Sequence, residues 1–306
     1  MKQLPHHTLF FAALVASVTT CFSQIVKIDS TSKWRKAFKA GLNVNQASFT
    51  SNWKAGGVNS LGITAFLNYK ANYKGEHNSW DSEIDLLYGM VNNQGLGYRK
   101  TLDRIFLDTR YGHELSKHWD LSASVNFLTQ FAPGYKYLKS VSGADSLVAL
   151  SDFLAPAFLT AGLGFEYHPV KYFKLRLSPV APRLTIVNDV TKFVTTDNPQ
   201  PYGVSVNRTS RMDWLAFQML AEFDKDIAKN VNLKWRYIFF ANYEKLSAEN
   251  LYHRLDLNLT AKLGRFMNAS FGTILLYDHN QDNSVQVSQA FSLGVLYTFQ
   301  NYQDKK

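Results

Sequence analysis

The chain has 306 residues, a formal net charge of +9 and a single cysteine, and 46% of its residues are hydrophobic. One cysteine excludes a disulfide framework and a thiolate metal cluster. The basic residues are spread along the chain rather than clustered, so the positive charge does not predict binding to nucleic acid.

The first 23 residues are organised like a secretory signal. A basic start precedes an apolar run from Leu9 to Val18, and Ser23 is a small residue at the expected cleavage point. Cys21 allows a rival interpretation as a lipid-modified cysteine, but Thr20 is unusual before such a site, so simple cleavage is favoured. We therefore predict an exported chain whose mature form has no cysteine.

After a short polar lead at 24–33, the chain is a succession of segments with a two-residue hydrophobic period. The segment 61–74 has seven apolar residues of one parity in a row. Such alternation is typical of strands with one apolar and one polar face. About twelve strands are expected, at 34–49, 61–74, 80–90, 101–114, 118–132, 152–168, 171–187, 212–226, 229–243, 250–263, 266–278 and 285–299. Pro156, Pro179 and Pro182 weaken two of them, because proline lacks the N–H that a ladder needs.

The connections between these strands alternate in length. Short turns such as 115–117 and 227–228 alternate with long connections at 50–60, 133–151 and 188–211. Transmembrane barrels have short periplasmic turns and longer outer loops. With the N-terminus in the periplasm, the pattern predicts an all-β fold: a transmembrane antiparallel β-barrel of about 12 strands (10–14) over 34–299, with a polar periplasmic tail at 300–306.

The last expected strand ends in a pattern of its own. Its apolar residues alternate up to Tyr297 and Phe299, and Gly294 precedes them. Gly294, Tyr297 and Phe299 fit the C-terminal signal that barrel-assembly machinery reads, although Gln300 to Lys306 follow it. The pattern favours the outer membrane of a Gram-negative bacterium.

Between 45 and 156 lies a distinctive set of residues: Asn45 to Ser60, Trp80, Tyr88-Gly89, Arg99-Lys100, Asp103, Phe131, Gly134-Tyr135 and Ser151 to Pro156. With these residues, the chain from about Trp34 to its C-terminus resembles a family of uncharacterised Bacteroidota proteins known as a domain of unknown function. The resemblance implies an outer-membrane barrel, and it carries no catalytic residues. Where that family has paired acids before the fourth strand, this chain has Leu102-Asp103.

Charged residues concentrate on the parity expected to face the barrel interior. They would either line a polar pore that orients a solute or form ion pairs that fill a narrow barrel. At about twelve strands, a constricted or plugged channel is as consistent with the pattern as an open one. The main candidates are Lys70, Asp81, Glu83, Asp85, Arg104, Asp108, Arg110, Glu166, Arg176, Glu222, Arg236, Arg254 and Asp256, with Lys74, Asp120, Lys174, Asp224, Lys234 and Lys262 on the same parity.

Two chemical alternatives were weighed against this interpretation. Asp81, Glu83 and Asp85 share one face, but they lie in a strand rather than a turning loop. Ion pairs with Lys70 and with Arg104 or Arg110 are therefore favoured over a metal site.

His113 and His253 have the lipid-facing parity that would suit a lipid-modifying enzyme, of the phospholipase or acyltransferase type. Neither has an adjacent serine in a Gly-x-Ser-x-Gly motif.

Two outer loops are candidates for recognition. The first contains Trp53, Gly56 and Gly57, and the second begins near Tyr135 and Tyr137. An exposed aromatic loop with flexible glycines could contact a partner or fold into the barrel mouth.

Together these features predict a non-enzymatic porin-like barrel without cofactor or metal, either a narrow or gated pore or a barrel subunit of an envelope complex. A lipid-modifying enzyme and a partner-binding scaffold are the alternatives. The expected partners are outer-membrane lipid, lipopolysaccharide, barrel-assembly machinery and an unidentified envelope protein, with no nucleic acid.

Overall fold

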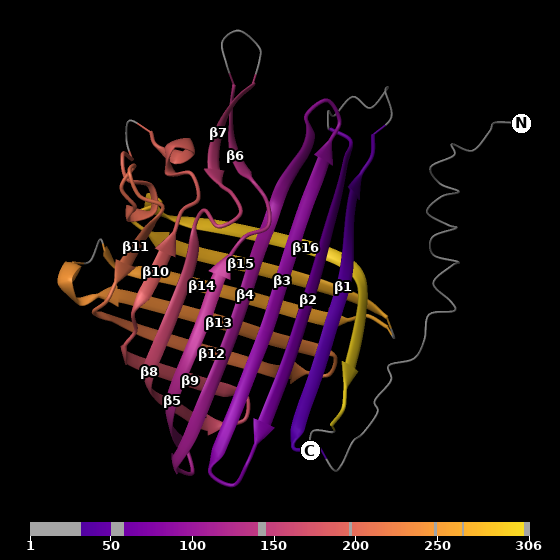
Figure 1. Cartoon of the computed structure of the whole chain (residues 1–306). Helices are drawn as coiled ribbons and strands as arrows, with labels where there is room; N and C mark the ends of the chain where they lie inside the picture. The colour runs from indigo at the N-terminus through magenta and orange to yellow at the C-terminus, as the bar shows by residue number, and fades with distance from the viewer. Residues whose placement is uncertain are drawn as a thin grey trace, which may run out of the picture.

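The computed structural model describes residues 32–49, 58–139, 145–195, 198–247, 250–264 and 266–302. Most of them form one antiparallel sheet that closes on itself (Figure 1). Its ring consists of β1 (Trp34–Ala47), β2 (Ser60–Lys74), β3 (Asn78–Asn93), β4 (Gly97–Ser116), β5 (Trp119–Thr129), β8 (Ala157–Val170), β9 (Phe173–Val180), β12 (Ala216–Ala228), β13 (Val231–Asn242), β14 (Tyr252–Lys262), β15 (Met267–Asp278) and β16 (Asp282–Gln300).

The ring closes where the first strand pairs with the last, with Leu42 opposite Val295. The successive strands β8 and β9 pair with each other, with Glu166 opposite Arg176. Short turns lie at the lower end in Figure 1, where β1 begins and β16 ends, and the longer connections lie at the upper end. The predicted all-β antiparallel barrel of about 12 strands is confirmed.

Two expected strands are each broken near the upper end. The segment 171–187 divides into β9 and β10 (Arg183–Ile186), and 212–226 divides into β11 (Ser210–Asp213) and β12. Pro179 and Pro182 flank the first break, where proline removes ladder donors. As a result β10 pairs with the upper half of β8, and β11 pairs with β10 outside the twelve-strand ring.

The long upper connections contain structure of their own. The expected loop 133–151 holds a hairpin of β6 (Gly134–Lys139) and β7 (Asp145–Ser151), which projects above the barrel in Figure 1. The strand expected from 152 begins only at 157, because Asp152 and Ala155 form a tight turn before Pro156. The remaining upper segments contain the short 3-10 turns η2 (Val190–Phe193), η3 (Pro201–Gly203) and η4 (Tyr243–Lys245). No helix in the described part of the chain is long and apolar enough to cross a membrane.

The barrel presents apolar side chains on its outer face as well as in its interior. Aromatic pairs follow one another around the lower outer face, for example Trp80 with Tyr111 and Phe223 stacked on Trp235. Inside, a buried cluster fills part of the upper half: Phe106, Leu128, Phe158, Ala216, Leu220, Ile238, Phe240 and Tyr252. A second buried cluster, which includes Val187, Val190, Phe193 and Tyr202, holds the upper connections together.

Candidate functional site in the barrel interior

Strand alternation and register bring the inward-facing charges together. Lys70 on β2 lies opposite Glu83 on β3, which in turn lies opposite Asp108 on β4. On the far wall, Glu222 on β12 lies opposite Arg236 on β13. Because alternate residues of a strand share a face, all of these side chains enter the interior.

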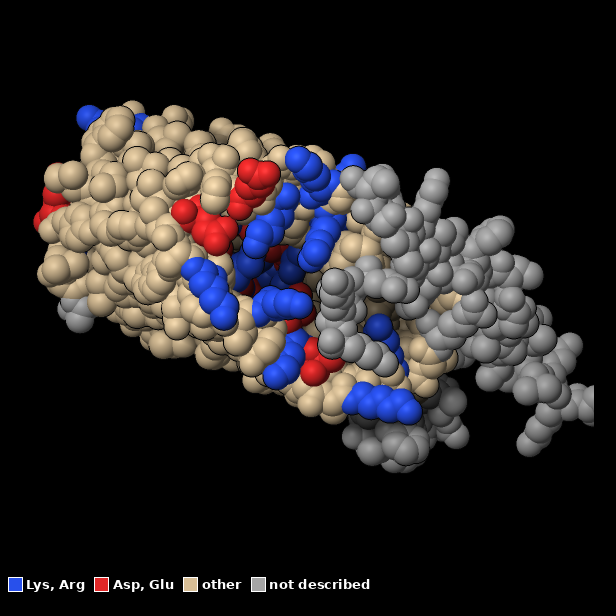
Figure 2. Space-filling model, turned by 90° about the horizontal axis from the view of Figure 1, so that it is seen from below, with Lys and Arg blue, Asp and Glu red and all other residues tan. Residues whose placement is uncertain are grey.

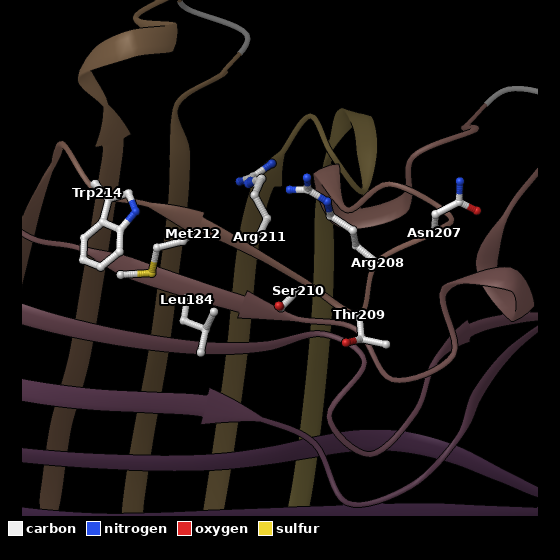
Figure 3. A pocket seen from close by; sticks show the side chains of 8 residues that line it. All are labelled: Leu184, Asn207, Arg208, Thr209, Ser210, Arg211, Met212 and Trp214. Atoms are coloured by element: carbon white, nitrogen blue, oxygen red, sulfur yellow. The ribbon is translucent and has the colours of Figure 1, made fainter.

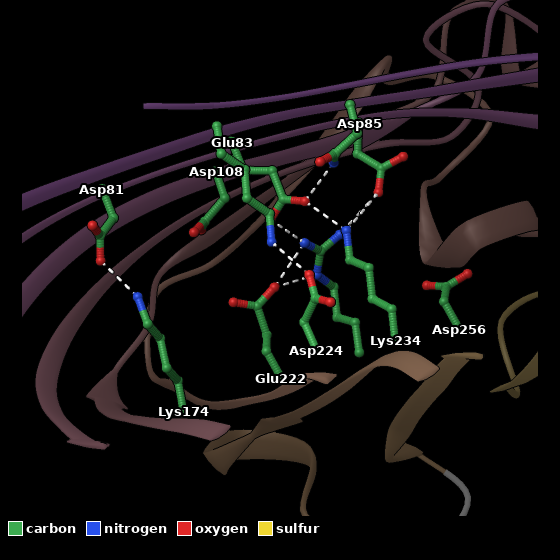
Figure 4. Close-up of polar contacts among 12 residues, drawn as sticks. Asp81, Glu83, Asp85, Asp108, Lys174, Glu222, Asp224, Lys234 and Asp256 are labelled. Carbon is green, nitrogen blue, oxygen red and sulfur yellow. Dashed lines mark hydrogen bonds and ion pairs between the residues drawn. The ribbon is translucent and has the colours of Figure 1, made fainter. Parts of the chain in front are cut away.

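Ion pairs between residues far apart in the sequence cross the barrel between β3 and β13. Arg236 is 3% exposed, and its Nη2 donates to Glu83 Oε2 at 2.5 Å and lies 2.7 Å from Glu222 Oε1. Lys234 Nζ donates to Glu83 at 2.8 Å and lies 3.6 Å from Asp85 (Figure 4). One wall of the barrel is therefore tied to the opposite wall through its interior.

A second group of ion pairs joins β4, β5, β8 and β9. Glu166 is 1% exposed, and its Oε2 lies 3.1 Å from Arg110 Nε and 3.4 Å from Arg176 Nε. Arg176 also donates through Nη1 to Asp108 at 2.9 Å, and Arg110 donates to Asp120. Each of these two arginines therefore has at least two carboxylate partners.

A third group of ion pairs joins β3, β4 and β14. Arg104 donates to Asp85 and to Asp256, both at 2.9 Å, and Arg254 donates to Asp256 at 2.9 Å. Lower in the barrel, Lys70 pairs with Asp224 at 3.2 Å. Lys174 pairs with Asp81 at 2.8 Å (Figure 4). We call the three groups together the charged belt.

The belt is balanced because nearly every buried charge in it has an opposite partner. An uncompensated buried charge is strongly destabilising, whereas a paired and hydrogen-bonded one is tolerated. The belt lies against the apolar cluster above it, since the Arg236 guanidinium stacks 4.0 Å from the centre of the Phe106 ring. In this conformation, charged and apolar layers together occupy the middle and upper interior.

Below the belt, the lower mouth is hollowed and lined with basic side chains (Figure 2). Lys39 and Lys262 are exposed there, and neither has an ion-pair partner among the described residues. Lys70 and Lys174 lie deeper and are paired with the carboxylates named above. The excess of ammonium groups gives this mouth a positive character.

The described part of the second recognition loop lies on the projecting hairpin. Tyr137 on β6 stacks under the guanidinium of Arg99, which lies 3.8 Å from the ring centre, and Tyr135 is exposed. Trp53, Gly56 and Gly57 of the first loop lie outside the described residues.

Between the upper connections, the Tyr202 hydroxyl donates to the carbonyl of Leu150. Burial raises the pKa of that phenol, so it stays protonated.

A polar anchor fixes the base of the hairpin. Asp103 accepts the backbone N–H groups of Phe131 at 2.7 Å and Ala132 at 3.0 Å. Lys100 pairs with Asp103 at 3.0 Å and donates to the carbonyl of Ala132 and to Ser151. Several residues that carry the family resemblance therefore meet at one place.

The two outward histidines have polar or aromatic neighbours. His113 Nδ1 lies 2.9 Å from the amide oxygen of Asn78, and His253 Nδ1 lies 2.7 Å from the Tyr237 hydroxyl. The rings of Phe239 and Tyr277 also contact His253. Within the described residues, no group of three His, Cys, Asp or Glu side chains is arranged to hold a metal ion.

The three residues of the expected assembly signal lie on β16. Tyr297 faces outward beside Phe38, at a ring distance of 6.3 Å, and Phe299 pairs with Phe38 across the β1–β16 seam. Gly294 lies opposite Asn43, and an added Cβ would meet the Asn43 side chain and the carbonyl of Leu42. At this position the seam has no room for a side chain.

A wide, shallow pocket lies along β10 and β11 (Figure 3). It is lined by Leu184 and Met212, by Trp214 at the end of β11, and by the polar run Asn207 to Arg211. Trp214 is 69% exposed, so this surface combines an apolar strip with polar groups above it.

Because two strands are broken, the sequence pattern does not identify every inward-facing residue. Lys174, Arg176 and Ser178 face inward from β9 on even numbers, but Arg183 and Thr185 face inward from β10 on odd numbers. The two prolines were the available signal, because a broken strand can resume on the other parity. Arg211, Asp213 and Asp278 also lie in the upper interior, and Lys39 in the lower.

Comparisons with known proteins found one family model. A family model described as "Protein of unknown function (DUF3078)" matches residues 44–135. That match includes the residues that carry the family resemblance as far as Tyr135 and ends before Ser151 to Pro156. No protein with a curated description matches the chain.

Three of the solved structures that resemble this chain are outer-membrane or secretion proteins by their names. The translocator domain of the autotransporter NalP from Neisseria meningitidis matches at 11% identity and a TM-score of 0.35, over 95% of this chain and 94% of that chain. An outer-membrane channel from Pseudomonas putida F1 matches at 10% identity and a TM-score of 0.36, over 87% of this chain and 94% of that chain. The NanC porin matches at 8% identity and a TM-score of 0.38, over 85% of this chain and 98% of that chain. At such values the likenesses say nothing about what this chain binds or transports.

Proposed function

We propose that this protein is an outer-membrane barrel that acts as a narrow, gated pore, with the charged belt as its gate. The single observation that carries the proposal is the contact of Arg236 with Glu83, which ties opposite walls together across the interior. A solute could cross only when this contact and its neighbours are broken.

The outer face supports a membrane location. Large apolar side chains are exposed on neighbouring strands, including Leu42, Ile63 and Val295. Such a surface would be costly in water and is favourable against hydrocarbon. Aromatic residues then gather toward the lower rim, as in the interfacial girdles of membrane barrels.

The belt has the properties of a gate rather than of a selectivity filter alone. Its charges are paired, and many of them are buried, so the ion pairs occupy space that a solute would need. Arg236 serves as a common donor to Glu83 and Glu222. Its removal would leave Glu222 without an ion-pair partner among the described residues, and Glu83 with Lys234 alone. Like charges at close range repel, and water would enter to solvate them.

Liposome swelling with small sugars and amino acids tests this proposal. Wild-type protein should give slow swelling, and the Arg236→Gln variant should give swelling several times faster. Lys229→Gln is the matched control, since Lys229 is exposed in the lower turn and lies away from the belt. Equal swelling rates in the Arg236→Gln and wild-type proteins would overturn the gate, provided that both insert to the same extent.

A second candidate is a partner-binding barrel of the envelope. The upper hairpin and its neighbourhood expose apolar side chains above the barrel, with Leu147 56%, Leu150 51% and Phe153 49% exposed. Exposed apolar side chains of this kind are typical of protein contacts. An outer-membrane pull-down should recover one stable partner with the wild type and lose it with Leu147→Ser/Phe153→Ser. Recovery of no partner would reject this candidate.

A further inference from the structure

The strongest unassigned feature is a buried arginine in the upper interior, separate from the belt. Arg183 is 5% exposed, and its guanidinium stacks 3.4 Å from the centre of the Phe240 ring. The rings of Phe158 and Tyr252 lie 5.3 and 5.2 Å away. Three aromatic rings therefore surround one cation.

This arginine differs from those of the belt in its partners. Arg104, Arg110, Arg176, Arg236 and Arg254 each lie within 4 Å of at least one carboxylate. Arg183 donates from Nε to Thr160 at 3.1 Å, and among the described residues no carboxylate pairs with it. Its two Nη atoms are the groups that a planar anion would engage.

A small cavity of about 50 Å³ lies against this guanidinium. Thr185 lines the same cavity from the same face of β10, and its hydroxyl is fully buried with no hydrogen-bond partner among the described residues. A buried hydroxyl without a partner is costly. The cationic Arg183 and the hydroxyl-bearing Thr185 therefore line the same cavity.

The acidic residues of the cavity restrict the charge that it can accept. Asp213 is occupied by Arg211 and Asn242, at 3.0 and 2.8 Å. Asp278 accepts from Asn280 and Gln281, at 3.1 and 2.8 Å. Their nearby negative charges disfavour a doubly charged phosphate and favour a singly charged anion.

We propose that this cavity binds the carboxylate group of a small organic acid. The two carboxylate oxygens would accept from the Nη atoms of Arg183, and the Thr185 hydroxyl would donate to one of them. The cavity has room for the carboxylate and little more, so the rest of the acid would extend toward Asn250 and Lys245, which also line it. This inference does not depend on whether the barrel conducts.

Titration of the purified barrel with ¹³C-labelled acetate tests the assignment. Acetate line broadening should saturate for the wild type, and acetamide, which has nearly the same shape without the charge, should not bind. Arg183→Gln should weaken acetate binding by about tenfold or more, as loss of a charged hydrogen-bonding partner does. Arg208→Gln is the matched control, because Arg208 is an exposed arginine of the same upper segment.

Thr185→Val provides a second test that keeps the packing nearly unchanged. It should weaken acetate binding by about fivefold, the effect of one lost hydrogen bond. The proposal fails if wild-type protein shows no saturable acetate binding, or if neither Arg183→Gln nor Thr185→Val weakens it. Tighter binding of inorganic phosphate than of acetate would overturn the choice of a carboxylate.

Discussion

In the charged belt, some carboxylates each form ion pairs with two arginines. Glu166 is the clearest case, since it lies between Arg110 and Arg176 and is almost fully buried. Replacing Glu166 would remove the carboxylate that the two guanidinium groups share. Because this part of the interior is buried, the lost contacts would not be replaced by contacts with bulk water.

We predict that Glu166→Gln lowers the free energy of unfolding by about 3–5 kcal/mol, the usual effect of removing one partner of a buried ion pair. Urea unfolding in lipid vesicles, followed by tryptophan fluorescence, measures it. The control is Glu76→Gln in an exposed turn, where a change within about 0.5 kcal/mol is expected. Similar losses in the two variants would mean that the belt contributes little to stability.

Gly294 gives a second prediction at this scale. An added methyl group would collide with the carbonyl of Leu42 and the side chain of Asn43 across the β1–β16 seam. Gly294→Ala should therefore lower stability by about 1–3 kcal/mol, as overpacking does. In Gly272→Ala, on the neighbouring strand, the new methyl would have only one neighbour within 4 Å, the carbonyl of Leu257 at 4.0 Å. If the two variants unfold at the same urea concentration, the seam is less tightly packed than described.

Much of the charged interior could be predicted residue by residue, because the alternation continues unbroken through β2 to β5. Lys70, Glu83 and Arg104 were assigned to the interior by parity alone. The expected pairs with a neighbouring arginine are present as Asp85–Arg104 and Asp81–Arg110. The pairs that cross the barrel could not be predicted, since Glu83 and Arg236 lie 153 residues apart in the sequence. Arg183 was missed because a break in its strand reverses the parity.

At the scale of elements, the hairpin β6–β7 is independent of the barrel sheet. Its two strands pair only with each other, and polar contacts at its base orient it. The sequence predicted a long loop here, because a short hairpin inside a long connection has too few residues for a clear period.

We predict that Asp103→Asn loosens this base, because a neutral amide holds the N–H groups of Phe131 and Ala132 less strongly than a carboxylate does. Hydrogen exchange at those two amides should become about tenfold faster, while exchange in the β2–β3 ladder stays unchanged. Asp226→Asn, at the opposite end of the barrel, serves as the control. Unchanged exchange at both amides would contradict the anchor.

The broken strands show a second limit of sequence patterns. The segments 171–187 and 212–226 each read as one strand, yet each supplies one strand to the ring and one to an added upper layer. The remaining strands were predicted to within a few residues, since nothing interrupts their two-residue period.

At the scale of the whole molecule, the band of aromatic residues around the lower outer face predicts how the barrel is positioned in a bilayer. Trp34, Trp80, Trp119 and Trp235 all belong to that band. Lipids brominated near the headgroup should quench the fluorescence of these tryptophans more than lipids brominated at the chain end. Efficient quenching of the same tryptophans by aqueous iodide would contradict a membrane location. Trp→Phe variants, made one at a time, would assign the signal.

Single-channel recording in planar bilayers tests the central claim, that the belt closes a membrane pore. Wild-type protein should stay closed for most of the record, with brief openings, and Arg236→Gln should be open for a much larger fraction of the time. A steady open conductance in the wild type from the moment of insertion would contradict closure by the belt. No openings in either protein would contradict the pore itself.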